Sequence, residues 1–187
     1  MIKNSFLLVV ALILCAACSS NKTETTTEAT TSEMAMATKE MPATVSTPWR
    51  NATAAYLNMK DALVSSDLAA AKLAAVDITS AIAGADMSAM GDSHNAWMEV
   101  APEVSAKAAA VGKATDIEAA RTAFYALSEP MVAAVKTLGE GGQDLFVQYC
   151  PMAFDNAGAN WLASEKEIRN PYFGDKMLTC GKVTEEL

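Results

Sequence analysis

The chain has little of what most catalytic sites use. Its 187 residues include one histidine, and aromatic residues make up only 6% of the sequence. General-base, triad and zinc sites usually need at least one well-placed histidine, so an enzyme is not expected. Positive charge is also scarce, because 14 Lys and Arg stand against 22 Asp and Glu, a net charge of -8. This balance opposes binding to nucleic acid.

Long hydrophobic runs are missing as well. The apolar run of residues 6–14 is too short to span a membrane, and it lies between Lys3 and a group of small residues, as in a secretory signal. The sequence Cys15-Ala16-Ala17-Cys18 resembles the processing box of bacterial lipoproteins. We therefore expect residues 1–17 to be a lipoprotein signal peptide and Cys18 to carry a lipid. An ordinary signal peptide cleaved nearby is the alternative.

The next segment lacks hydrophobic periodicity. Residues 18–47 are rich in Thr, Ser and Glu, and such a composition buries too little surface to offset the entropy of ordering the chain. The sequence predicts a disordered, lipid-attached tether here and a folded domain over residues 48–187. The protein would then be anchored in the cell envelope, facing the periplasm or at the outer membrane.

Four segments of the domain have apolar residues at alternating steps of three and four, which predicts amphipathic helices. They are residues 48–64, residues 67–84, residues 87–111 with breaks or kinks at Gly91 and Pro102, and a helix that opens with a capping box at Thr115 and bends at Pro130. Such helices bury their faces only against one another, so we expect an all-α, antiparallel four-helix bundle. Much of its core should come from large residues, namely Trp49, Tyr56, Trp97, Phe124 and Leu127.

The last 48 residues, 140–187, break the helical pattern. Glycines end the fourth helix, residues 145–149 predict a strand, and residues 161–168 predict a short helix. We expect an irregular, short-strand extension with a Cys-Met pair at each end. Cys150 and Met152 form the first pair, and Met177 and Cys180 form the second.

Two readings of these pairs stay open. If Cys15 is removed and Cys18 is acylated, only Cys150 and Cys180 remain as thiols in the folded part. Two thiols in an exported chain favour a disulfide, which would stabilise the fold by about 3–4 kcal/mol. Thiolates beside thioethers instead favour Cu(I) or Ag(I).

His94 and Met98, one turn apart in the third predicted helix, offer an imidazole and a further thioether. A histidine on an apolar stripe is also compatible with a hydrogen-bonded core position.

Several of these segments resemble a known family, the bacterial domain of unknown function 3347. In the tail they are Gln148-Tyr149-Cys150-Pro151-Met152-Ala153-Phe154, Trp161-Leu162, and residues 167–181 with Asn170-Pro171-Tyr172-Phe173-Gly174 and Lys176-Met177-Leu178-Thr179-Cys180-Gly181. Residues 56–63 and 94–98 are similar to the family too, so the resemblance spans about residues 48–184. Such domains occur as small exported proteins or appended to periplasmic adaptor subunits of heavy-metal efflux pumps of the RND type, and the resemblance implies copper or silver handling.

Residues 149–152 also resemble the opening of a heavy-metal-binding motif of copper ATPases and efflux adaptors, with Ala153 where that motif usually has His.

The sequence thus leads to two hypotheses, neither of them an enzyme. In the first, a lipid-anchored envelope protein binds Cu(I) or Ag(I) for buffering or for delivery to an efflux adaptor or another envelope protein. Its ligands would be Cys150, Met152, Met177 and Cys180, with His94 and Met98 as further contributors. In the second, no metal is bound, and a Cys150-Cys180 disulfide ties the tail to the bundle of a structural or interaction module.

Overall fold

The computed structural model describes residues 43–187, and side chains from Thr47 onward. These residues belong to one compact unit, Lys39–Leu187. The predicted signal peptide, the lipidation residue Cys18 and the expected tether up to residue 42 lie outside the described residues. No helix within the described part is long and apolar enough to cross a membrane.

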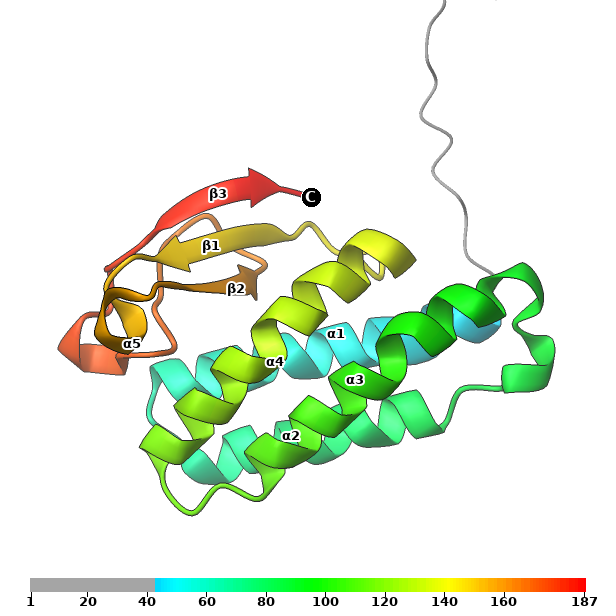
Figure 1. Ribbon diagram of the computed structural model, residues 1–187, viewed down its shortest axis with the longest axis horizontal. Helices are drawn as coiled ribbons and strands as arrows, with labels where there is room; N and C mark the ends of the chain where they lie inside the picture. The colour runs from blue at the N-terminus through cyan, green and yellow to red at the C-terminus, as the bar shows by residue number, and fades with distance from the viewer. Residues whose placement is uncertain (1–42) are drawn as a thin grey trace, which may run out of the picture. The chain divides into compact units, whose positions relative to one another are not determined.

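Four main helices are followed by a small sheet (Figure 1). The helices are α1 (Ala43–Val64), α2 (Leu68–Ala83), α3 (His94–Gly112) and α4 (Ile117–Leu138). Two short 3-10 turns, η1 (Met87–Ala89) and η2 (Gly91–Ser93), separate α2 from α3. The tail contains β1 (Phe146–Cys150), the short segment α5 (Ala153–Asn156), β2 (Ala159–Ala163), the 3-10 turn η3 (Gly174–Lys176) and β3 (Lys182–Glu186).

The helices pack as the sequence predicts. Consecutive helices run antiparallel, with α1 against α2, α2 against α3 and α3 against α4 (Figure 1). Contact between α1 and α4 is slight, and β2 packs on α4 at this side of the bundle. The sheet therefore covers the side of the bundle between α1 and α4.

The starts of two helices differ from the prediction. Helix α1 begins at Ala43 and not at residue 48, so Pro48 lies inside it. The N-cap of α4 is Asp116, whose carboxylate accepts a 2.8 Å hydrogen bond from the backbone N–H of Ala119. Its neighbour Thr115, the predicted cap, donates its hydroxyl to the Asp116 carboxylate instead.

The predicted break near Gly91 is confirmed by the two 3-10 turns, whereas both helix prolines are accommodated. Pro102 lies within α3 and Pro130 within α4, and each helix continues past its proline. An internal proline removes one backbone hydrogen bond, and the tertiary packing of these long helices outweighs that loss.

The expectation of an all-α domain is wrong, because the tail forms a three-stranded antiparallel sheet. Its strand order is β2-β1-β3, and Cys150 at the end of β1 pairs with Ala159 at the start of β2. The helix predicted over residues 161–168 is also wrong. Trp161, Leu162 and Ala163 are fully buried in strand β2, so pairing with β1 and packing on α4 override their local helix preference.

The core contains the large residues that the sequence indicated. Trp49, Tyr56, Trp97, Phe124 and Leu127 are each 2% exposed or less. Aromatic rings also join the bundle to the tail, because Phe124 stacks on Tyr56 at 5.0 Å and lies 5.8 Å from the ring of Tyr172. The tail is therefore part of the hydrophobic core and not an appendage.

Candidate functional site

The structure brings the two predicted thiols together. Cys150 is the last residue of β1, and Cys180 lies two residues before β3. Their Sγ atoms are 3.1 Å apart, and both cysteines are free. Cys150 is fully buried, whereas Cys180 is partly exposed. The tail thus makes the closure that both a shared metal ion and a disulfide require.

Hydrogen bonds from Asn170 and the lack of a side chain at Gly181 hold Cys180 in this position. The Asn170 side-chain amide donates to the Cys180 carbonyl (2.7 Å), and its backbone N–H donates to the Leu178 carbonyl (2.8 Å). Gly181 has a φ of +149°, and a Cβ atom there would lie 3.0 Å from both the Trp161 ring and the Tyr149 carbonyl oxygen. Glycine therefore permits the close approach of this turn to the sheet.

The contact between the thiols changes the acidity of one of them. The hydrogen bond with Cys150 raises the pKa of the Cys180 thiol, and partial burial adds to that effect. A hydrogen bond from the backbone N–H of Met152 to the Cys180 sulfur acts in the opposite direction, lowering its pKa. The net shift is upward, so Cys180 is a protonated thiol at neutral pH, and an ion that binds it must displace a proton.

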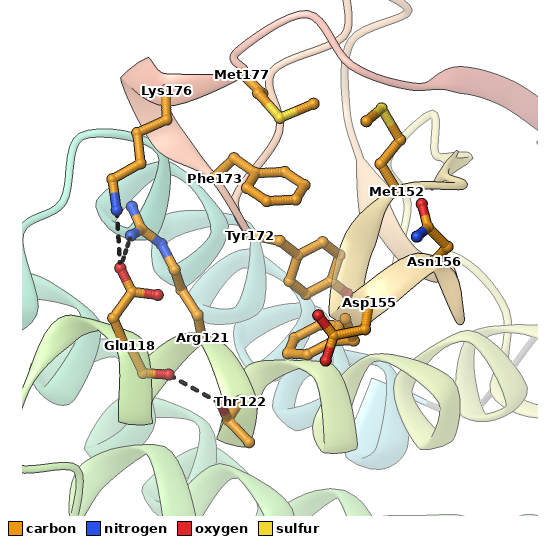
Figure 2. A pocket seen from close by; sticks show the side chains of 11 residues that line it. Glu118, Arg121, Thr122, Met152, Asp155, Asn156, Tyr172, Phe173, Lys176 and Met177 are labelled. Carbon is orange, nitrogen blue, oxygen red and sulfur yellow. Dashed lines mark hydrogen bonds and ion pairs between the residues drawn. The ribbon is translucent and has the colours of Figure 1, made fainter.

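A cavity of about 590 Å³ is lined by residues close in sequence to the two cysteines (Figure 2). We call it the thioether pocket, because both predicted thioether ligands, Met152 and Met177, line it. The other lining residues are Glu118, Arg121, Thr122, Phe154, Asp155, Asn156, Tyr172, Phe173 and Lys176. Each methionine is close in sequence to one of the cysteines, so the thiol contact and the pocket are built from the same two chain segments.

An unusual turn forms one wall of the pocket. Phe154, Asp155 and Asn156 have φ values of 51°, 56° and 69°, so α5 is not a regular helix. This left-handed conformation costs an L-residue roughly 1–2 kcal/mol. Packing of the Phe154 ring offsets part of that cost, because it lies 4.4 Å from the Tyr125 ring and 5.4 Å from the Tyr172 ring.

The opposite wall is held by a buried arginine. Arg121 of α4 donates to the carbonyls of Pro171 (3.1 Å) and Leu63 (3.1 Å), to Ser66 Oγ (2.9 Å), and to Glu118 (3.0 Å). These bonds join α1, α4 and the tail. Because its guanidinium is so fully engaged, Arg121 positions the pocket wall and is not available as a ligand-binding charge.

His94 and Met98 are not near the thiols. Both lie in the first turns of α3, which begins at the end of the bundle away from α5 and the tip of β1 (Figure 1). The expected place of His94 on the apolar stripe is wrong, because His94 is exposed and Met98 is 47% exposed, whereas the buried residues of α3 begin at Trp97. The structure thus brings the two thiols into contact, places Met152 and Met177 in one pocket, and leaves His94 and Met98 apart from both.

Within residues 43–187, no three His, Cys, Asp or Glu side chains group so that they could hold a metal ion. The aromatic residues of the pocket, Phe154, Tyr172 and Phe173, were missed by the sequence analysis. The only available signal was their position between the two Cys-Met pairs.

The helical part of the chain matches a known family. Residues 52–143 match the family described as "Protein of unknown function (DUF3347)". The chain therefore contains a DUF3347 domain, as the resemblance predicted. The match covers the bundle from within α1 to just past α4 and ends before β1. The cysteines and most of the thioether pocket therefore lie beyond it, while the pocket residues Glu118, Arg121 and Thr122 lie within it. No curated protein and no solved structure matches the chain.

Proposed function

We propose that this protein binds a soft monovalent metal ion, Cu(I) or Ag(I), at Cys150 and Cys180 in the cell envelope, and buffers it or delivers it to an efflux system. The observation that carries the proposal is the 3.1 Å contact between the two thiol sulfurs. Each of these cysteines is two or three residues from a methionine that lines a shared pocket. Thiolate and thioether sulfur form the ligand set that prefers Cu(I) over Zn(II), Mg(II) and Ca(II).

The thiol pair needs only a small adjustment to hold an ion. Metal–sulfur bonds are about 2.3 Å long, so two sulfurs that share one ion in a trigonal arrangement lie roughly 4 Å apart. The sulfurs of Cys150 and Cys180 would have to separate by about 1 Å from their present 3.1 Å. Cys180 is the residue that can move, because it is partly exposed and lies in a turn, while Cys150 is buried in the central strand.

The proposed location rests on the N-terminal sequence. Lipidation at Cys18 would attach the protein to a membrane of the envelope, where a heavy-metal efflux adaptor or another envelope protein would be its partner. The excess of acidic residues, 22 against 14 basic ones, suits a protein that handles cations and does not bind nucleic acid.

The same thiol contact favours a second function, in which no metal is bound. A disulfide requires the two sulfurs to approach to about 2.05 Å, again about 1 Å from the present 3.1 Å. Such a bond would link the end of β1 to the start of β3. The protein would then be a structural or interaction module that recognises an envelope partner by its surface.

The test is a competition titration of the reduced, full-length protein against a Cu(I) chelator without oxygen, repeated with Zn(II). Every protein compared carries Cys15→Ala/Cys18→Ala, so that Cys150 and Cys180 are its only thiols. We expect one tightly bound Cu(I) per chain, far weaker Zn(II) binding, and a large loss of Cu(I) affinity in Cys180→Ala. Met98→Leu is the matched control, since Met98 is an exposed methionine away from the site. If the reduced wild type binds Cu(I) no better than Cys180→Ala does, the disulfide-linked module is the better account.

A further inference from the structure

Two thioethers face each other across the mouth of the thioether pocket. Met152 comes from the turn after β1, and Met177 immediately follows η3. Figure 2 shows the sulfur-bearing ends of the two side chains pointing toward one another, with Phe173 and Tyr172 below them. Met152 is 50% exposed, so an ion in solution can reach this pair without unfolding any part of the domain.

These two methionines differ from those that fill the core. Met59, Met90 and Met131 are completely buried and act as flexible gap fillers. Exposure alone is not decisive, because Met98 is exposed to a similar degree. Among the described residues, only Met152 and Met177 combine a facing thioether with a cysteine two or three residues away in sequence. Met152 is exposed, and Met177 is partly buried.

The surroundings of the pair suit a cation. The rings of Phe173 and Tyr172 form the wall behind the thioethers, and aromatic faces attract cations. Asp155 adds an exposed carboxylate on the Met152 side, and this carboxylate makes no ion pair within the described part of the chain. The two basic lining residues, Arg121 and Lys176, both contact Glu118 on the other side (Figure 2).

The pair is also connected to the thiols. The backbone N–H of Met152 hydrogen-bonds to the Cys180 sulfur, and the Cys180 N–H donates to the Met177 carbonyl at 3.1 Å. The left-handed turn at Phe154–Asn156 fixes the direction in which the chain leaves Met152. Backbone strain of this kind tends to cluster at ligand clamps and other functional sites.

We infer that Met152 and Met177, in front of the Phe173 and Tyr172 rings, form a second binding site for a soft monovalent cation, the thioether site, which does not need the thiols. This inference rests on the proposed function, since the thioether site would bind the ion from solution and transfer it to Cys150 and Cys180. In that step the bonds from the ion to thioether sulfur break, bonds to thiolate sulfur form, and the thiol protons go to water. No electrons are transferred.

The test uses Ag(I), which needs no reductant, and the full-length protein with all four of its thiols removed as Cys15→Ala/Cys18→Ala/Cys150→Ala/Cys180→Ala. Calorimetric titration should show one Ag(I) per chain, bound more weakly than by the reduced Cys15→Ala/Cys18→Ala protein, which keeps Cys150 and Cys180. Adding Met152→Leu or Met177→Leu should lower this affinity by about tenfold or more, at least the effect of losing an outer-shell partner at a metal site. Adding Met98→Leu should leave it unchanged.

Two further measurements keep the test decisive. If the alanine variant does not fold, as judged by circular dichroism, the Cys15→Ala/Cys18→Ala protein oxidised to the disulfide with oxidised glutathione replaces it. The Ag(I) affinity of the thioether site should also stay constant from pH 6 to 8, because thioethers release no proton when they bind a metal ion. The proposal of a thioether site would be overturned if the thiol-free protein did not bind Ag(I), or if its Met152→Leu and Met177→Leu variants bound Ag(I) equally well. Neither result would affect the proposed thiol site. A reduced Cys15→Ala/Cys18→Ala protein that binds no more tightly than the thiol-free protein would instead overturn the thiol site.

Discussion

Cys150 and Cys180 are chemically unequal, although both carry the same thiol. Cys150 is held in the central strand of the sheet and has no exposed surface. Cys180 lies in a turn, is partly exposed, and has a raised pKa because it shares a hydrogen bond with Cys150. We therefore expect Cys150 to keep its position. Cys180 is the residue that would move, and its thiol would lose a proton when it binds an ion or is oxidised.

This inequality predicts slow, pH-dependent alkylation of Cys180 in the reduced, metal-free protein. Only the thiolate reacts, so a raised pKa leaves less of the reactive form at any given pH. The pH at half-maximal rate should lie above that of a cysteine in a short unfolded peptide. Cys150→Ala should shift it downward, because the largest cause of the raised pKa is then lost. The rates follow from mass spectrometry after timed exposure to iodoacetamide, and equal profiles for both proteins would contradict this origin of the shift.

At the scale of elements, one hydroxyl joins two helices and the sheet. The Tyr56 side chain of α1 is fully buried, and its hydroxyl shares a 2.8 Å hydrogen bond with Ser128 of α4. It also accepts a 3.3 Å hydrogen bond from the backbone N–H of Leu162 in β2. Tyr172 of the tail donates to Ser128 from the other side. The sheet is thereby hydrogen-bonded to the side of the bundle that α1 and α4 form.

Tyr56→Phe should therefore destabilise the whole domain and not one helix. It leaves the Leu162 N–H buried without this acceptor, and such a loss costs about 1–3 kcal/mol. Urea unfolding measures the change in the free energy of unfolding. Tyr125→Phe is the matched control, because no hydrogen bond involves the Tyr125 hydroxyl within residues 43–187. Equal stabilities of the two variants would mean that the Tyr56 hydroxyl does not connect the sheet to the bundle.

At the scale of the whole molecule, the DUF3347 match and the candidate chemistry occupy different parts of the chain. Residues 52–143 account for most of the bundle, while the thiols and most of the thioether pocket come from the tail. Glu118, Arg121 and Thr122 of α4 are the residues through which the bundle lines the pocket. The bundle thus acts as a rigid support on which the tail arranges its sulfur ligands.

The proposed membrane attachment gives a prediction at this scale. Cys18→Ser should move the protein from the membrane to the soluble fraction, because the lipid has no other predicted attachment point. Cys15→Ser is the control and should leave the protein at the membrane, since Cys15 belongs to the predicted signal peptide. Cell fractionation followed by mass spectrometry of the N-terminal peptide measures both. A Cys18→Ser protein that still partitions with membranes would contradict the lipoprotein interpretation.

The sequence by itself determined the four helices and the residues of their buried faces. Helical hydrogen bonds are local, and an apolar stripe such as Trp49 to Tyr56 marks its own buried side. Helix ends were less predictable, because Thr115 and Asp116 offer equivalent caps and because packing accommodates Pro102 and Pro130. The sequence placed His94 on the apolar face of the third helix, but the structure exposes it. The spacing of apolar residues does not show where the neighbouring helix ends and stops covering that face.

Only the tertiary structure decided the fold of the tail and the layout of the candidate site. Trp161 lies in a segment with local helix preference, and it becomes a strand residue because β1 and α4 bury it. The spacing of Cys150 and Cys180 permitted their contact without requiring it, and Gly181, Asn170 and the sheet supply the closure. These interactions join residues far apart in the chain, so their free energies depend on the assembled core and leave no periodic signal in the sequence.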